Sequence, residues 1–295
     1  MSEKPEIIVF GEVLFDCFQN GTRVLGGAPF NVAWHLQAFG DQPKFISRIG
    51  DDELGRMILS AMRGWHMDVT HVQLDPRHPT GKVEVTMIHN EPHYRITPNC
   101  AYDFISSETL FHLPRRSILY HGTLGLRNEG SRKSFSQLLQ CCPESSVFLD
   151  VNLRAPWWKK EDVYHWLEKA RWVKLNEHEI VQLELGHDDT KEAMVKLQQK
   201  FSLEQVILTL GEKGAMVLGR DGEFHHVVPE KADEFVDTVG AGDAFTAVYI
   251  HGLQAGWSIA DSLQAAQYFA SKVIGIRGAT SNDPEFYKDF IQRFI

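Results

Sequence analysis

The sequence lacks several features that would place a protein in a specialised class. Cysteine occurs only four times in 295 residues and never as Cys-x-x-Cys, so neither a disulfide framework nor a zinc ribbon is predicted. No apolar run approaches the roughly 18 residues of a membrane-spanning helix. The N-terminus also has no basic region followed by an apolar core. We therefore expect a cytoplasmic protein with reduced thiols and no membrane partner.

Positive charge is also scarce. The chain has 30 Lys and Arg against 39 Asp and Glu, a net charge of −9, whereas nucleic-acid binders usually carry a basic face. The histidines show no His-Glu-x-x-His spacing, so we assign them no metal. The pattern Gly-x-Gly-x-x-Gly does not follow the first apolar run, residues 7–10. These absences argue against a nucleic-acid partner and a nicotinamide-dependent dehydrogenase.

Short apolar runs alternate with helix-like segments along the chain. This alternation predicts an α/β fold with a mostly parallel central sheet and helices on both faces. Residues 83–87 and 93–96 instead alternate apolar and polar positions, which predicts a hairpin with one solvated face. With no internal repeat and no Pro/Ser-rich linker, residues 1–295 are expected to form a single domain. The runs expected as strands of the main sheet are residues 7–10, 45–49, 118–120, 147–150, 172–175 and 206–209.

Polar residues follow directly after several of these runs. In open α/β sheets, ligands bind outside the carboxyl ends of the strands, so these residues are expected to gather at one rim of the sheet. They are Asp51, His121, Asn152, Arg154, residues 176–179 and residues 211–214.

The segment DTVGAGDAF, residues 237–245, is the most informative stretch of the chain. Gly240 and Gly242 precede a run with apolar residues at helical spacing, so a helix is predicted to begin here. The bare N–H groups and partial positive charge of a helix N-terminus favour an anion, above all a phosphate. Asp243 lies in the first turn, where a carboxylate is either a helix cap or a catalytic group.

Three segments together resemble the signatures of one family, the ribokinase-like, or PfkB-type, carbohydrate kinases. Residues 237–245 closely resemble its C-terminal signature, residues 26–33 (GGAPFNVA) its sugar-binding segment, and residues 50–55 (GDDELG) its N-terminal signature. Residues 11–16 and 150–154 look most like the fructokinase branch. The resemblance implies a ribokinase-like fold with a small inserted β-sheet lid, formed by segments of about 13–25 and 80–102.

The family resemblance also implies a reaction, the transfer of the γ-phosphoryl group of ATP to a sugar hydroxyl. Asp243 would take the proton of the accepting hydroxyl, and the amides of Gly240, Ala241 and Gly242 would hold the transferring phosphoryl group. The residues that would bind the sugar are Asp16, Gly26, Gly27, Asn31, Arg95 and Asp243. Arg154 would support the phosphates, with a surface ion pair as the alternative.

Other residues are assigned to the nucleotide and to ions. Asn176 and Glu179 match the family's Asn-x-x-Glu motif, which holds magnesium largely through water, although their spacing equally suits a helix cap. A β-turn is the alternative for residues 209–214. The resemblance assigns to the nucleotide Asn176, Thr209, Gly211, Gly214, Gly240 and Gly242, and to a potassium ion Asp237, Val239 and Gly278.

The expected acceptor is D-fructose, with 2-keto-3-deoxygluconate, ribose or a nucleoside as alternatives. An uncharged acceptor is favoured because Lys82 and Arg95 are the only Lys or Arg residues between Thr80 and Asp103. A non-catalytic sensor of sugar or nucleotide on the same scaffold is the rival from another class. Lids of this family sometimes also form dimer interfaces, so a homodimer through the lid stays open.

Overall fold

The main sheet has nine strands in the order β13-β12-β11-β10-β9-β8-β1-β4-β5. The computed structural model describes residues 4–88, 91–110, 113–186, 189–229 and 236–295. Strands β1, β4, β5 and β8 to β11 are parallel, and β12 and β13 are antiparallel to their neighbours. All strands that the apolar runs predicted are present. The nine strands are β1 Glu6–Phe10, β4 Lys44–Gly50, β5 Val72–Asp75, β8 Ser117–His121, β9 Ser146–Asp150, β10 Trp172–Asn176, β11 Gln205–Thr209, β12 Ala215–Leu218 and β13 Phe224–Val227.

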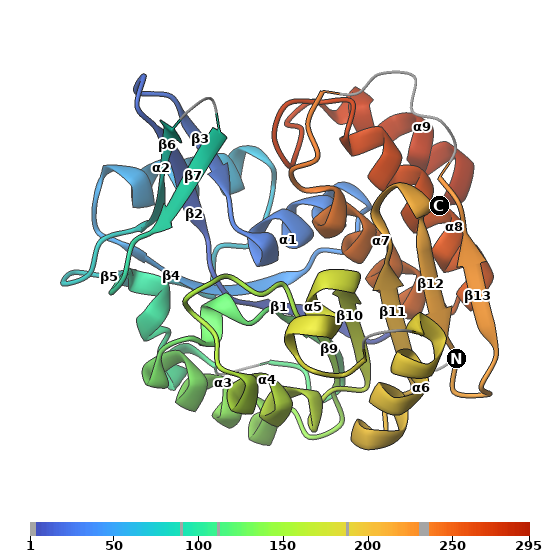
Figure 1. Ribbon diagram of the computed structural model, residues 1–295. Helices are drawn as coiled ribbons and strands as arrows, with labels where there is room; N and C mark the ends of the chain where they lie inside the picture. Colours follow the sequence, from blue (N-terminus) through green and yellow to red (C-terminus); the bar gives the residue numbers. More distant parts are fainter. Residues whose placement is uncertain (1–3, 89–90, 111–112, 187–188, 230–235) are drawn as a thin grey trace.

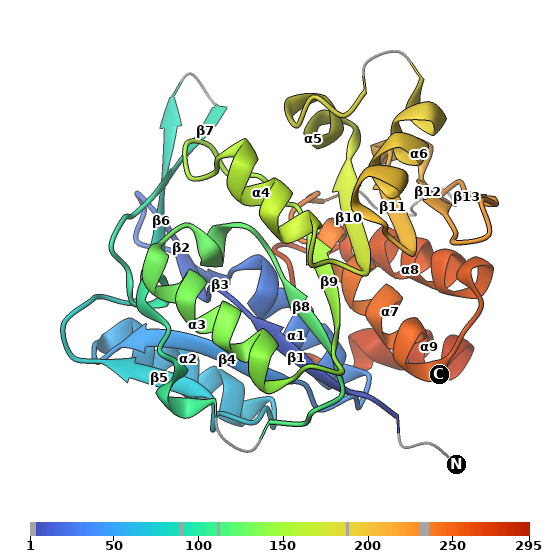
Figure 2. The ribbon, with the colours of Figure 1, turned by 90° about the horizontal axis from the view of Figure 1, so that it is seen from below.

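Helices cover both faces of this sheet (Figures 1 and 2). One layer consists of α1 Ala28–Ala38, α2 Glu53–Gly64, α7 Ala241–Ala255, α8 Ile259–Val273 and α9 Pro284–Phe294. The other consists of α3 Glu129–Cys141, α4 Lys160–Leu167, α5 Glu177–Gln182 and α6 Thr190–Phe201. Four short turns, η1 Ala101–Phe104, η2 Ser107–Thr109, η3 Leu124–Leu126 and η4 Gly211–Lys213, complete the described helices. In the part of the chain described, no helix is long and apolar enough to cross a membrane.

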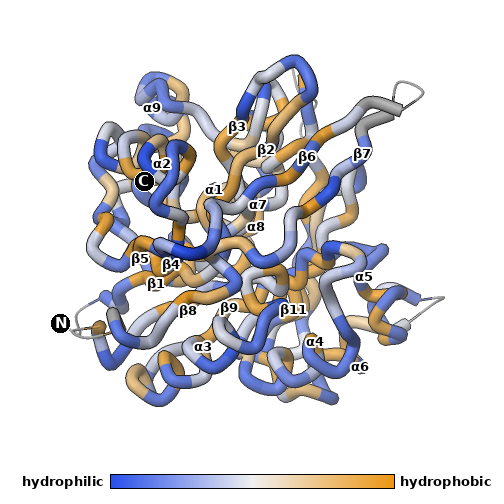
Figure 3. Tube along the Cα trace, turned by 90° about the vertical axis from the view of Figure 1, so that its left-hand side faces the viewer, coloured by the Kyte–Doolittle hydropathy of each residue, from blue (hydrophilic) through white to orange (hydrophobic). Residues whose placement is uncertain are grey.

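The sequence forms two cores because successive strand residues point to opposite faces. In β1, Ile7 and Val9 belong to the core under α1 and α7, whereas Ile8 and Phe10 belong to the core under α3 and α4. A sheet that is buried on both faces needs continuous apolar runs, which is why these strands are recognisable in the sequence. In Figure 3 the hydropathy colours agree, with β1, β4 and β8 mainly hydrophobic.

A second, smaller sheet has the order β3-β2-β6-β7 and is hereafter the small sheet. Its strands β2 Leu14–Phe18, β3 Arg23–Gly26, β6 Gly81–Ile88 and β7 Glu91–Ile96 come from the two segments that the family resemblance predicted as a lid. Figure 1 shows it at one end of the molecule, with α8 and α9 at the other. The predicted fold class, a helix-covered sheet with a small separate sheet, is therefore confirmed.

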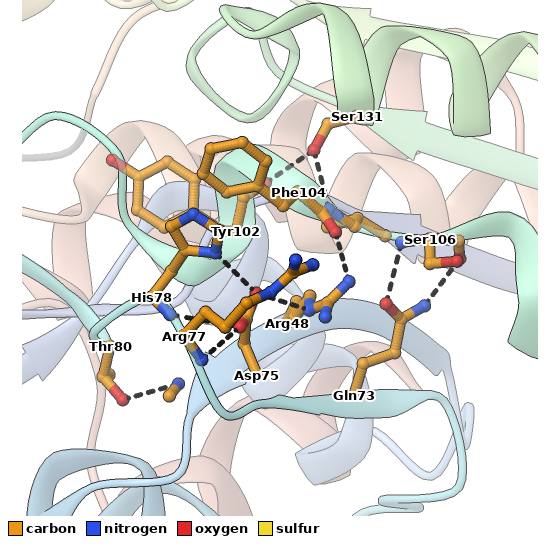
Figure 4. A network of polar contacts seen from close by, with 12 residues as sticks. Arg48, Gln73, Asp75, Arg77, His78, Thr80, Tyr102, Phe104, Ser106 and Ser131 are labelled. Carbon is orange, nitrogen blue, oxygen red and sulfur yellow. Dashed lines mark hydrogen bonds and ion pairs between the residues drawn. The ribbon is translucent and has the colours of Figure 1, made fainter.

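The connections of the small sheet are fixed to the edge of the main sheet by a buried polar network (Figure 4). Asp75, at the end of β5, accepts hydrogen bonds from the backbone N–H groups of Arg77 and His78 and from His78 Nδ1. Arg48 Nε lies 2.9 Å from Asp75, and Arg48 Nη1 donates to the Phe104 carbonyl at 2.7 Å. The His78 ring stacks on Phe104, with 3.8 Å between centroids. The network thus joins the segment that leads into β6 to the segment that follows β7.

Asp52 adds a second anchor at the start of β6. Its carboxylate caps α2 by accepting from Gly55 N at 2.8 Å, and it also accepts from Thr80 N at 2.8 Å and Thr80 Oγ1 at 2.7 Å. Thr80 Oγ1 in turn accepts from Gly50 N. In this chain the segment 50–55 therefore caps a helix and holds the small sheet in place.

We expect Asp52→Ala to lower the free energy of unfolding by about 2–3 kcal/mol, since it removes a cap and two further hydrogen bonds. Asp51→Ala is the matched control, because the Asp51 side chain is 66% exposed and its ion pair with Arg56 spans 3.6 Å. Urea unfolding of both variants measures the difference. Equal stabilities of the two variants would contradict this assignment.

Candidate active site

The N-terminus of α7 lies at the centre of the site. Gly240 precedes the helix with a left-handed φ of 82°, and no side chain of the described residues caps the first turn. Glycine is required here because a Cβ on Gly240 would collide with Ala279. The N–H group of Ala241 forms a long hydrogen bond to the Thr238 carbonyl, at 3.4 Å. The N–H groups of this turn and the positive end of the helix dipole are suited to hold an anion.

Asp243 lies in that first turn. Its carboxylate accepts a hydrogen bond from a side chain of another helix and does not cap α7. Asn31 Nδ2 donates to Asp243 Oδ2 at 2.8 Å. Burial raises the pKa of Asp243 to about 6, against the lowering effect of the Asn31 hydrogen bond. The nearby Asp150 adds to the rise, while Lys174 and Arg154 oppose it. The carboxylate is therefore ionised at neutral pH and able to accept a proton.

The residues predicted to bind sugar adjoin this pair, with one exception. Asn31 N donates to the Gly27 carbonyl at 2.8 Å, and Gly26 packs against Asp16, whose Oδ2 would lie 3.8 Å from a Cβ at position 26. Gly27 has a φ of 108°, and a Cβ there would lie 2.8 Å from the Glu12 carbonyl oxygen. The glycine pair thus lets α1 begin close against the end of β1.

Arg95 is the exception. In the small sheet it is paired with Glu84, which lies opposite Cys17, whereas Asp16 lies opposite Val83. Because side chains alternate between the faces of a strand, Arg95 and Asp16 point to opposite faces of the small sheet. The Arg95 side chain is 79% exposed and forms an ion pair with Glu84. The structure therefore does not bring Arg95 to the predicted sugar site.

A buried ion pair that the sequence analysis missed lies behind the α7 N-terminus. Lys174 Nζ lies 2.8 and 3.1 Å from the carboxylate oxygens of Asp150, and Thr246 Oγ1 donates to Asp150 at 3.1 Å. A Cβ on Gly242 would lie 3.4 Å from Lys174 Nζ, so the ammonium group is next to the helix start. The available signal was a lysine inside an otherwise apolar strand, where an unpaired charge is costly.

Glu12 was also missed as a site residue. It lies two residues after the end of β1 and is 2% exposed, and its Oε2 has no hydrogen-bond partner among the described residues. Burial raises the pKa of Glu12 to about 7. Burial likewise raises the pKa of Asp16 to about 6. The positive charge of Arg154 lowers the pKa of Glu12, Asp16 and Asp243. One guanidinium group therefore stabilises the ionised form of three carboxyl groups.

Asn176 and Glu179 form a reciprocal cap at the start of α5. Asn176 Oδ1 accepts from Glu179 N, and Glu179 Oε2 accepts from Asn176 N, both at 2.9 Å. Glu179 Oε1 accepts from Leu153 N at 2.8 Å. In the described residues no group of three or more His, Cys, Asp or Glu side chains forms a metal cage. The donor set suits magnesium held through water and phosphate oxygens, because each carboxylate oxygen keeps a free lone pair.

The residues predicted for the nucleotide lie beside this cap. Thr209 is the neighbour of Asn176 in the β10–β11 ladder. Gly211 and Gly214, with φ of 59° and 91°, turn the chain from β11 into β12. A Cβ on Gly214 would collide with the Val227 carbonyl, so the turn packs tightly on β13. Next to it lies a groove of about 350 Å³, whose lining includes His226, Val228, Gln264, Gln267, Tyr268 and Phe294.

The residues predicted for potassium come from two adjoining segments. The N–H groups of Val236 and Asp237 both donate to the Ile274 carbonyl, at 2.9 and 3.1 Å. Asp237 Oδ1 accepts from Val239 N at 3.1 Å, and Gly278 has a φ of 84°. Ala279, next to Gly278, packs on Gly240. The two segments therefore lie together beside the start of α7.

We expect Lys174→Met to lower the free energy of unfolding by roughly 3–5 kcal/mol, because it leaves the Asp150 carboxylate buried without its counter-ion. The double variant Lys174→Met/Asp150→Asn removes both charges and is expected to recover much of this loss. Chemical unfolding of the two variants is the measurement. A double variant less stable than the single one would show that the pair is not the source of the effect.

The chain is similar to known proteins over nearly its whole length. Residues 5–285 match the pfkB family carbohydrate kinase. A fructokinase of Klebsiella pneumoniae is 30% identical, over 98% of this chain and 99% of its own. An aminoimidazole riboside kinase from Salmonella enterica, solved with aminoimidazole riboside and an ATP analogue, has a TM-score of 0.85 at 24% identity, covering 97% and 99% of the two chains. A fructokinase from Vibrio cholerae O395, bound to fructose, ADP and calcium, has a TM-score of 0.80 at 25% identity, covering 97% and 98%.

Proposed function

Because the chain belongs to the pfkB family of carbohydrate kinases, we propose that it transfers the γ-phosphoryl group of ATP to a hydroxyl group of D-fructose. The observation that carries this proposal is the pairing of Asn31 with Asp243 at the uncapped start of α7. It puts a proton acceptor beside a site for an anion, which is what phosphoryl transfer requires. The intact Asp243 also argues against a non-catalytic sensor.

In this mechanism Asp243 takes the proton of the attacking hydroxyl. Asn31 fixes one oxygen of the carboxylate, which leaves the other for the sugar. The N–H groups of Gly240, Ala241 and Gly242 stabilise the negative charge on the transferring phosphoryl group. Lys174 adds positive charge behind Gly242.

Asn176 and Glu179 are the residues that would hold magnesium, which when bound neutralises charge on the ATP phosphates. Thr209, Gly211 and Gly214 would contact the nucleotide. Asp237, Val239 and Gly278 would supply oxygens to a potassium ion near the start of α7. We further propose that residues 1–295 act as one domain, with the small sheet as a lid and as the surface of a homodimer.

The charges around Asp16 support a neutral acceptor. Lys82 lies opposite Phe15 in the β2–β6 ladder, and Arg23 of β3 lies opposite Cys17. The three Lys and Arg residues of the small sheet, Arg23, Lys82 and Arg95, therefore all point away from the face that carries Asp16. An acceptor with a carboxylate or phosphate would meet the negative charges of Asp16 and Asp243, which are offset by Arg154 and, at Asp243, by Lys174, itself paired with Asp150. Fructose, the ligand of the Vibrio cholerae fructokinase, has no such charge.

We expect Asp243→Asn to lower kcat by roughly 10²-fold or more, because the amide cannot accept a proton at neutral pH. Wild-type activity is expected to fall as the pH drops below about 6, where Asp243 becomes protonated. Steady-state rates across pH, with calorimetric binding of ATP and fructose as the control for folding, measure both effects. A near-normal kcat in Asp243→Asn would remove this residue as the base.

A screen of ADP release across neutral sugars, sugar acids, nucleosides and sugar phosphates tests the acceptor. We expect fructose to give the highest kcat/KM and Asp16→Asn to raise its KM about tenfold, the scale of one lost charged hydrogen bond. Arg95→Ala is the matched control and should change this KM less than twofold, since Arg95 faces the other side of the small sheet. A higher kcat/KM for ribose, a nucleoside or 2-keto-3-deoxygluconate would overturn the fructose assignment while leaving a sugar kinase.

A further inference from the structure

Arg127 holds the segment by which the chain leaves the small sheet. It follows η3, and its side chain is 5% exposed. Its Nε lies 2.6 Å from Asp103 Oδ1 and its Nη2 lies 2.8 Å from Asp103 Oδ2, a two-pronged ion pair. Nη2 also donates to the carbonyl of Thr97, the residue directly after β7, at 2.7 Å. Arg127 thereby ties the exit of the small sheet to the turn after β8.

The same guanidinium contacts two aromatic rings. It lies 4.4 Å from the ring centroid of Trp157 and 5.0 Å from that of Tyr102. Tyr102 belongs to the exit segment and packs on the first residue of β6, where a Cβ on Gly81 would lie 2.6 Å from the Tyr102 ring. Trp157 belongs to a different part of the chain, the loop after β9. Arg127 therefore joins the small sheet to that loop.

The loop after β9 carries Arg154. Trp157 N donates to the Arg154 carbonyl at 2.7 Å, which closes a tight turn between the two residues. Before this turn, two hydrogen bonds fix the loop. Val151 N donates to the Lys174 carbonyl, and Leu153 N donates to the Glu179 carboxylate. After it, the Trp157 ring rests on Arg127. The position of Arg154 is thus set between the phosphate side of the site and the exit of the small sheet.

We propose that Arg127 and Trp157 are positioning residues, whose stacking couples the placement of the small sheet to that of Arg154 beside Asp16 and Asp243. The inference rests on the proposed kinase function and adds a physical link between the sugar side and the phosphate side. Neither side chain needs to touch a substrate for this role. A shift of the small sheet moves Thr97, Asp103 and Tyr102, and with them Arg127 and the ring that it supports.

The pKa of Asp243 is a measurable quantity that would not change if Arg127 and Trp157 were merely structural. If Arg154 leaves its place, one cation near Asp243 is lost and the pKa of Asp243 rises. The acid limb of the pH–rate profile then shifts to higher pH, because the base must be ionised to act. The groups that face Asp243 are Asn31 from α1, Glu12 after β1, Tyr120 from β8, Asp150 from β9, Lys174 from β10 and Arg154.

The experiment compares Trp157→Leu with Trp157→Phe and with Trp158→Leu in the full chain. Leucine removes the aromatic face, phenylalanine keeps one, and Trp158 is a partly buried neighbour that packs on the α3–α4 core instead of on Arg127. With the best acceptor of the wild type, we expect Trp157→Leu to raise the acceptor KM at least about fivefold and to shift the acid limb upward by about half a pH unit or more. The KM for ATP should change less than twofold. Trp157→Phe should restore both quantities, and Trp158→Leu should leave both unchanged.

Two outcomes overturn the inference alone: a wild-type pH profile and acceptor KM in Trp157→Leu, or the same changes in Trp158→Leu as in Trp157→Leu. If Trp157→Leu does not fold, Arg127→Lys replaces it, because lysine keeps the charge opposite Asp103 but not the flat group that stacks on Trp157. The same two shifts are then expected. Absence of sugar-dependent ATP turnover in the wild type would instead overturn the proposed function, and this inference with it.

Discussion

The hydrogen bond from Asn31 to Asp243 joins the two halves of the site. Asn31 lies in the first turns of α1 and Asp243 in the first turn of α7, 212 positions apart in the sequence. Both helices cover the same face of the main sheet, and they begin close together at the same rim. The turn before α1 brings Gly27 against the segment after β1 and Gly26 against Asp16, whereas the turn before α7 presents backbone N–H groups. One contact therefore aligns the predicted sugar side with the predicted phosphate side.

The electrostatics of the rim follow from the low supply of cations. Lys174 forms an ion pair with Asp150. Arg154 is the cation whose charge lowers the pKa of all three of Glu12, Asp16 and Asp243. Such a rim repels an additional negative charge unless that charge meets the helix N-terminus or a metal ion. This arrangement favours an anionic donor on the α7 side and a neutral acceptor on the side of the small sheet.

The sequence alone predicted those parts of the structure that depend on local pattern. Continuous apolar runs marked the buried strands, and Gly240 and Gly242 marked the uncapped start of α7. The position of Arg95 could not be obtained in this way. Period-two alternation shows that Arg95 and Tyr94 lie on opposite faces, but only the β2–β6–β7 register shows which face carries Asp16. Lys174 and Asp150 were overlooked for a similar reason, because their pairing arises from neighbouring strands that are 24 residues apart.

The anchoring of the small sheet restricts the lid movement that we propose for it. The entry into β6 is fixed by Asp52 and the Asp75 network, and the exit from β7 by Arg127, so neither of these two connections is a free linker. Movement of the sheet must then either bend its strands above these anchors or displace the anchors themselves. Bending leaves Arg127 and the loop after β9 in place, whereas displacement carries Trp157 with it. Under the proposed coupling, the position of Arg154 would therefore distinguish the two kinds of closure, because displacement of the exit anchor would change the charge near Asp243.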